Sequence, residues 1–330
     1  MVMGLLSAAT ILAAGSTRAE EGRLRIAQQF GVVYLTLNVA QEQKLFEKYG
    51  KKAGIDIDVE FAQLSGGGAV NDALLSGSID IAGAGVGPLF TLWDRTYGRQ
   101  NVKGVASLGN FPYYLTTINP DVKTIADFTD KDRIAVPAVG VSVQSRILQW
   151  ASAKLWGDGQ FDRLDRISVA VPHPEAAAAL IKGGTEITAH FGNPPFQEQI
   201  LAENPKAHIV LKSYDVQGGP ASSTVLYATE KFVTESPLTY KAFLDGLEEA
   251  AKFVRENPEA AADIYIKAAG AKTDRKLLLD VIKSPEVKFT ITPENTLGLG
   301  QFLNRVGAIK NEPKTIGDYF FSEPRISSGS

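Results

Sequence analysis

The chain of 330 residues contains no cysteine, which excludes disulfide bonds, a catalytic thiol, a cysteine-ligated metal and a lipid-anchored cysteine. Histidine is nearly absent as well. Its three copies, His173, His190 and His208, fall on separate predicted segments and not in one group of metal ligands. We therefore predict no metal ion and no cofactor.

Neither sign of charge is in large excess, with 34 basic and 37 acidic side chains and a net charge of −3. Such a balance argues against a nucleic-acid partner and against attraction to a membrane surface. The hydrophobic fraction of 44% is enough to fill complete cores. The length suits two domains of ordinary size.

One apolar run, residues 4–14, lies near the start of the sequence and is too short to cross a bilayer. Thr17 and Ala19 place small residues where a signal peptidase reads, so we expect residues 1–19 to be an export signal that is cleaved before Glu20. Cleavage removes one charge, that of Arg18, and leaves 33 basic against 37 acidic side chains. No other run is long enough for a membrane helix, and we predict a soluble protein exported to the periplasm.

The first third of the chain alternates strands and helices. Predicted strands at residues 24–27, 55–61 and 79–82 are each followed by a segment with helical periodicity. This order predicts a parallel, doubly wound α/β sheet. Ligands of such sheets bind beyond the C-terminal ends of the strands.

Two glycine-rich stretches lie at those strand ends. Ser65–Gly68 and Gly83–Gly87 each lead into a predicted helix, so free backbone N–H groups and the positive end of the helix dipole can hold an anion there. The spacing is not that of a Walker A loop, because no Gly-Lys-Ser/Thr follows, and the second stretch lacks the third glycine of a dinucleotide fingerprint. Glycine turns of this kind also serve as plain connections, and that alternative stays open.

The chain is predicted to cross twice between two such α/β units. A strand at residues 102–108 is broken at 109–112 and resumes at 113–118, and the segment 215–220 suits the return crossing. Between the crossings the βα pattern repeats, and Ser142 either caps the helix that follows it or contacts a ligand. The remainder is predicted to be helical, with the last main helix beginning at Thr292-Pro293.

The stretch from Leu74 to Pro88 reads L-x-x-G-x-I-D-I-A-x-x-G-x-x-P and resembles a signature of the solute-binding proteins of nitrate, sulfonate and taurine ABC importers. Four further segments are similar to the same family: residues 107–110, 136–144, 191–196 and 316–320.

The resemblance implies the type II periplasmic-binding fold, in which two doubly wound α/β domains are joined by a hinge and enclose a ligand cleft. It assigns residues 20–109 and 219–330 to domain I and residues 110–218 to domain II. It also implies the substrate-binding component of an ABC importer, and not an enzyme. The ligand is then a small anion, for which we favour a taurine-like aliphatic sulfonate or a nitrate-like solute.

In this family the binding protein delivers its solute to a membrane permease that an ATPase drives, so the expected partners are the solute and the permease. We expect a monomer. The candidate ligand-binding residues are Phe30, Tyr34, Ser65, Gly66, Gly85, Val86, Gly87, Asn110, Tyr113, Val141, Ser142, Gln144, His190 and Asn193. No arginine falls inside these loops, but Arg146, one turn beyond Ser142, is positioned to reach the ligand.

Two alternatives share the same fold. One is a cofactor-independent lyase, which the export signal argues against. The other is a binder of a thiamine-precursor pyrimidine, which is disfavoured because the cysteine-rich motif of that group is absent. A desulfinase of this fold uses a cysteine nucleophile, which this chain lacks.

Overall fold

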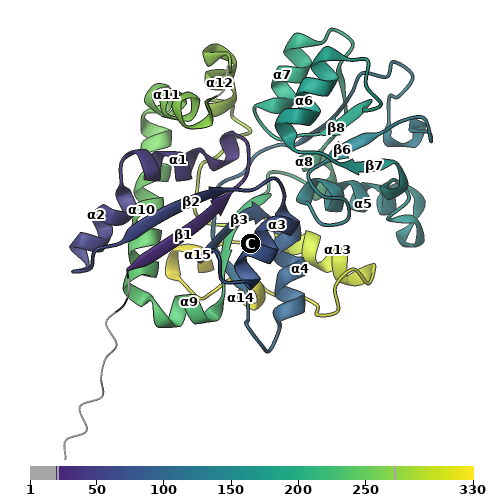
Figure 1. The fold of residues 1–330 in the computed structure, drawn as a ribbon. Helices are drawn as coiled ribbons and strands as arrows, with labels where there is room; N and C mark the ends of the chain where they lie inside the picture. The colour runs from purple at the N-terminus through teal and green to yellow at the C-terminus, as the bar shows by residue number, and fades with distance from the viewer. Residues whose placement is uncertain (1–19, 21, 271–272) are drawn as a thin grey trace, which may run out of the picture.

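The computed structural model describes residues 20, 22–270 and 273–330, and the predicted export signal at residues 1–19 lies outside them. Within the described residues, the strands form two five-stranded sheets with helices packed around each (Figure 1). The predicted two-domain α/β fold is therefore confirmed. No helix in the described part of the chain is long and apolar enough to cross a membrane.

The first sheet has the strand order β2-β1-β3-β10-β4. Its strands are β1 (Arg23–Gln28), β2 (Asp58–Gln63), β3 (Ile81–Gly85), β4 (Lys103–Ser107) and β10 (Thr224–Ala228). Ile26 of β1 pairs with Phe61 and Ile81 in parallel register, whereas β10 runs antiparallel to both of its neighbours. The connecting helices are α1 (Leu35–Glu42), α2 (Leu45–Lys52), α3 (Gly67–Leu75) and α4 (Val86–Thr96), with the 3-10 turn η1 (Val32–Tyr34) before α1.

The second sheet has the order β7-β6-β8-β5-β9. Its strands are β5 (Tyr114–Thr117), β6 (Ile134–Val136), β7 (Ser168–Ala170), β8 (Ala189–Phe191) and β9 (His208–Lys212). Its helices and 3-10 turns are η2 (Ile125–Asp127), α5 (Val143–Trp156), η3 (Asp158–Gln160), η4 (Asp165–Ile167), α6 (His173–Lys182) and α7 (Phe196–Glu203). Both sheets are mixed, not parallel as predicted, because the strand beside each crossing, β5 or β10, enters its sheet from the opposite direction.

The crossings between the sheets meet at a small polar network. The side chain of Asn110 accepts a hydrogen bond from Ser222 Oγ (2.7 Å) and donates one to Glu294 (2.5 Å). Its backbone pairs with Lys288, so three segments of the chain are held together where the polypeptide passes from one domain to the other. The return crossing contains the short helix α8 (Ser213–Gln217), which the sequence did not predict.

The C-terminal third is helical, as predicted, and mostly braces the first sheet (Figure 1). Its helices are α9 (Glu230–Glu235), α10 (Pro237–Glu256), α11 (Pro258–Ala269), α12 (Arg275–Ile282), α13 (Leu297–Arg305), α14 (Ile316–Tyr319) and α15 (Pro324–Ser327). Apolar residues of α10 recur at helical spacing, and Phe243 packs on Phe46 of α2 with ring centroids 5.2 Å apart. In contrast, α13 reaches the other domain, where Phe302 stacks on Trp150 of α5.

Three predicted boundaries are wrong, one for a local reason and two because of contacts distant in sequence. The helix expected from Tyr34 is split at Lys44, which takes a left-handed conformation. The residues Gly83–Gly85 belong to β3 and not to a turn, because they pair with β10. The helix expected at Thr292-Pro293 begins only at Leu297, since hydrogen bonds to Ser222 and to the C-terminal residues hold the segment before it outside a helix, and Asn295 takes a left-handed conformation.

Candidate functional site

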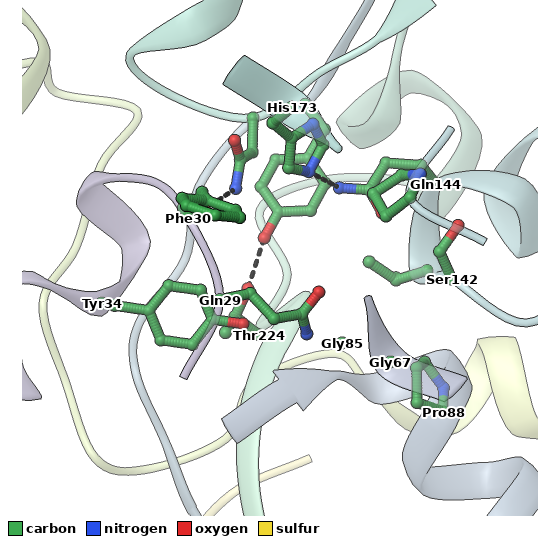
Figure 2. A pocket seen from close by; sticks show the side chains of 14 residues that line it. Gln29, Phe30, Tyr34, Gly67, Gly85, Pro88, Ser142, Gln144, His173 and Thr224 are labelled. Carbon is green, nitrogen blue, oxygen red and sulfur yellow. Dashed lines mark hydrogen bonds between the residues drawn. The ribbon is translucent and has the colours of Figure 1, made fainter. Parts of the chain in front are cut away.

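A cavity lies between the C-terminal ends of the strands of the two sheets (Figure 2). The space that the centre of a water molecule can reach inside it is about 20 Å³, roughly what one ordered water needs. It is lined by Gln29, Phe30, Tyr34, Gly67, Gly85, Pro88, Tyr113, Pro137, Ser142, Val143, Gln144, His173, Asn193 and Thr224.

Three helices begin at this cavity. The starts of α3 at Gly67 and of α4 at Gly85 come from the first sheet, and the start of α5 at Ser142 comes from the second. The first N–H groups of a helix have no partner within the helix and carry its positive partial charge. The N–H of Val86 already donates to Ser223 O. The first turn of α4 therefore has one N–H group fewer with which to bind a ligand in the cavity.

The lining, all of which lies in the described part of the chain, contains no lysine, arginine, aspartate or glutamate. Its tyrosines are also neutral: burial raises the pKa of Tyr113 and of Tyr34 well above the ordinary value. The Tyr113 hydroxyl lies 2.5 Å from Thr224 Oγ1, and the Tyr34 hydroxyl donates to Gly83 O over 3.3 Å. An anion in this cavity would be held by neutral donors and helix dipoles, without a neutralising side chain.

Two histidines lie at one side of the cavity, His173 in its lining and His190 behind His173. His190 Nε2 lies 3.0 Å from His173 Nδ1. His173 Nε2 lies 3.2 Å from Gln144 Nε2, as Figure 2 shows. Burial lowers the pKa of His190 to about 4, and burial with the neighbouring His190 lowers the pKa of His173 well below its usual value. Both rings are therefore uncharged at neutral pH.

The two domains are bonded to each other across the cavity. Asn193 Nδ2 donates to Phe30 O over 3.0 Å, and Val32 N donates to Pro194 O over 2.9 Å. Asn193 is buried, and its Oδ1 has no hydrogen-bond partner among the described residues. The loop that follows β1 and the loop that follows β8 are thus in direct contact.

The glycines predicted to approach a ligand instead approach the opposite domain. A Cβ built on Gly85 would lie 2.7 Å from the Val143 side chain, and one on Gly66 would lie 2.8 Å from Pro137 O. One on Gly87 would lie 3.0 Å from both Arg146 Cγ and Val141 O. The absence of side chains therefore lets the helix starts of the two domains come together.

The hydroxyl of Ser142 is bonded within its own loop and helix. It donates to Ala138 O over 2.8 Å and accepts from Ser145 N over 3.3 Å. Of the two roles that the sequence left open, the structure shows the helix cap.

Of the predicted residues, the structure brings seven to the cavity: Phe30, Tyr34, Gly85, Tyr113, Ser142, Gln144 and Asn193. The other seven do not line it: Ser65, Gly66, Val86, Gly87, Asn110, Val141 and His190. Asn110 belongs to the network at the crossings, and His190 lies behind His173.

Arg146 does not line the cavity either. It is 8% exposed, and its Nη1 donates to Gln149 Oε1 over 3.0 Å. Gln149 in turn donates to Asp165 over 2.6 Å, so the guanidinium of Arg146 is linked to that carboxylate through Gln149 and not to the cavity lining. Burial lowers the pKa of Arg146, although Asp165 acts in the opposite direction.

Seven lining residues are not among the fourteen named candidates, although one of them, Gly67, lies within the predicted anion-binding stretch Ser65–Gly68: Gln29, Gly67, Pro88, Pro137, Val143, His173 and Thr224. Most of them are adjacent in sequence to a predicted residue. The strand-end rule would have included these if each predicted segment had been extended by one residue. Thr224 opens the strand after the return crossing, and His173 opens α6, so no local signal distinguished either one.

A model of the NMT1-like family matches residues 18–268 of the chain. The comparison with curated proteins gives no match.

Solved structures share the fold. The alkanesulfonate-binding protein SsuA of Xanthomonas axonopodis pv. citri, bound to MOPS, is 17% identical with a TM-score of 0.70, over 90% of this chain and 96% of that one. The periplasmic nitrate-binding protein NrtA of Synechocystis PCC 6803 is 19% identical with a TM-score of 0.69, over 87% and 82% of the two chains. The aliphatic sulphonate binding protein SsuA of Escherichia coli is 16% identical with a TM-score of 0.64, over 91% and 97%. At these identities the likeness shows the fold alone.

Proposed function

Because this chain belongs to the NMT1-like family, we propose that it is the periplasmic substrate-binding component of an ABC importer. It captures a small anion, for which we favour an aliphatic sulfonate over a nitrate-like solute, and delivers the anion to a membrane permease. It acts as a monomer, is not an enzyme and needs no cofactor.

One observation carries the proposal. Helix starts from both domains converge on a single cavity whose lining has no charged side chain. Such a cavity suits a small anion, which backbone N–H groups can hold without a counter-charge. The described lining also offers no strong acid, base or nucleophile, which is consistent with binding without reaction.

We further propose that the bound solute contacts the lining residues Phe30, Tyr34, Gly85, Tyr113, Ser142, Gln144 and Asn193, with Ser142 taking part through its backbone because its hydroxyl caps α5. The other predicted residues act around them. Gly66 and Gly87 allow the domains to meet, and Asn110 lies at the hinge between domain I (20–109 and 219–330) and domain II (110–218). In this structure the cavity has room for about one water molecule, so the domains must move apart about this hinge to admit and hold the solute.

The proposal also includes export of the protein and cleavage of its signal. We propose that residues 1–19 are removed before Glu20. The carboxylate of Glu20 accepts hydrogen bonds from the N–H groups of Thr239 (2.6 Å) and Leu238 (3.0 Å) at the start of α10. The first residue of the processed chain then supports a helix N-terminus, where a negative charge is favourable. Mass analysis of the exported protein tests this, since an uncleaved product would contradict it.

The experiment for the function is calorimetric titration of the purified protein with methanesulfonate, ethanesulfonate, taurine and nitrate, with choline as a cationic control. We expect at least one anion to bind with micromolar affinity or better, choline not to bind, and the anion to be recovered unchanged. Binding of choline alone, or conversion of an anion, would contradict the proposal.

A further inference from the structure

A line of hydrogen-bonded groups runs from the second sheet to the cavity. It begins at the backbone oxygen of Ala135 in β6, which lies 3.0 Å from His190 Nδ1. It continues through the contacts of His190 with His173 (3.0 Å) and of His173 with Gln144 (3.2 Å). These three side chains are at most 4% exposed, and they come from β8, α6 and α5.

The direction of every hydrogen bond in this line is fixed by its first member. A backbone carbonyl can only accept, so His190 carries its proton on Nδ1. The ring is neutral, so its Nε2 must accept, and His173 must donate from Nδ1. His173 is then left with an unprotonated Nε2, which accepts from the amide nitrogen of Gln144. This two-histidine relay leaves one orientation for the Gln144 amide.

That orientation decides what Gln144 offers to a ligand. Its nitrogen is engaged by His173, whereas its Oε1 takes part in no hydrogen bond among the described residues. Oε1 is also absent from the fully buried unpaired atoms, so it keeps some accessible surface. Since the residue is 4% exposed and lines the cavity, that surface faces the cavity.

The acceptor and the starts of α3 and α4 occupy different sides of the site, whereas the start of α5 lies beside the acceptor, because Gln144 belongs to its first turn. Figure 2 shows Gln144 and His173 at one side of the cavity, and Gly67, Gly85 and Pro88 at the other. An acidic group suits the side where α3 and α4 begin. A carbonyl oxygen without a hydrogen-bond partner repels an acidic group but accepts a favourable hydrogen bond from an N–H or O–H donor.

We propose that the two-histidine relay makes Gln144 a specificity-determining residue, whose carbonyl oxygen accepts a hydrogen bond from a donor that the solute carries beside its acidic group. The inference rests on the proposed function and narrows its solute class to small acids with an amino or hydroxyl group. Among sulfonates, these are the aminoalkane- and hydroxyalkanesulfonates. His190 and His173 are positioning residues, because they act through Gln144.

The test compares three sulfonates of nearly equal size: taurine, 2-hydroxyethanesulfonate and ethanesulfonate. In calorimetric titrations of the unaltered protein, we expect the two donor-bearing sulfonates to bind about tenfold or more tightly than ethanesulfonate, the worth of one hydrogen bond. In Gln144→Met, the ratio of affinities between each donor-bearing sulfonate and ethanesulfonate should fall to near one. His190→Phe should give the same loss of preference, whereas His208→Phe, at a histidine bonded elsewhere to Val122 O, should keep it.

A second measurement needs neither ligand nor variant. The chain has three histidines, so ¹⁵N nuclear magnetic resonance of the histidine-labelled protein resolves each ring. We expect a proton on Nδ1 and none on Nε2 for both His190 and His173 at neutral pH. A proton on Nε2 of His173 would overturn the inference, because Gln144 would then present its nitrogen to the cavity.

The binding outcomes separate this inference from the function on which it rests. Equal affinity for all three sulfonates would overturn the role of Gln144 and leave the proposed function standing. Failure of every anion to bind would overturn both.

Discussion

The side-chain nitrogen of Asn193 donates a hydrogen bond to the backbone oxygen of Phe30 over 3.0 Å and so joins the loops that follow β8 and β1. The neighbouring bond from Val32 N to Pro194 O runs in the opposite direction over 2.9 Å. Because the two loops belong to different sheets, these bonds exist only while the domains are together. They therefore favour the closed state over the open one.

Replacement of this side chain should weaken closure without harming either core. We expect Asn193→Ala to lower the affinity for the solute about tenfold, the equivalent of one hydrogen bond. The thermal midpoint without ligand should change little. Titration calorimetry measures the affinity, and Asn304→Ala is the control, since that amide bonds to Lys310 O far from the cavity. An unchanged affinity in Asn193→Ala would show that the contact does not support the bound state.

Substitution of Gly85 directly tests the close approach between the domains. A methyl group at this position would lie 2.7 Å from the Val143 side chain, so Gly85→Ala should hold the domains apart and reduce solute affinity at least tenfold. Solution scattering should then show no compaction on adding solute. Gly68→Ala is the matched control, because a Cβ at Gly68 meets nothing within 4 Å. Equal affinity in both variants would contradict the closure argument.

Substitution of Ser142 distinguishes a hydroxyl that caps a helix from one that contacts the ligand. Because its hydroxyl already donates to Ala138 O and accepts from Ser145 N, Ser142→Ala should lower the free energy of unfolding by about 1 kcal/mol. Solute affinity should stay within a few-fold of the unaltered protein. A thermal melt and a titration on the same sample give both values. A large loss of affinity with normal stability would instead place the hydroxyl on the ligand.

Glu198 makes stability depend on pH. Burial raises the pKa of this α7 side chain from 4.5 to about 7, so between these pH values the folded chain holds a proton that the unfolded chain has released. Stability therefore falls as the pH rises through this window. Glu198→Gln removes this ionisable group and with it the pH dependence. The free energy of unfolding of the variant, relative to that of the unaltered protein, should therefore be higher at pH 8 than at pH 5 by an amount on the order of 2 kcal/mol. Denaturant titrations at both pH values measure it, and a constant difference would contradict the burial.

The two-domain fold could be predicted because its signals are local. Apolar strands, helix-period segments and glycine stops follow one another in the order that a doubly wound sheet requires. Strand direction was predicted less well, since β5 and β10 look like any other strand and become antiparallel only through the crossings. The Thr292-Pro293 pattern failed because a contact distant in sequence, to Ser222, prevents the helix from starting there.

The site was predicted in outline and not in detail. Phe30, Gln144 and Asn193 reach the cavity as the strand-end rule implies. The rule does not distinguish a loop backbone that contacts a ligand from one that contacts the other domain. Gly87 was predicted to contact the ligand, but it contacts the other domain. The pairing of His173 with His190 joins residues from α6 and β8, so it follows from tertiary packing alone.

The central claim is that a small acidic solute binds between the two domains and leaves unchanged. The most direct test is mass spectrometry of the molecule released when protein purified from its native cells is denatured. The account predicts one small acid, in stoichiometric amount, that rebinds to the refolded protein and is recovered intact. Release of a cationic or large apolar molecule, or of a product formed from the solute added back, would contradict it.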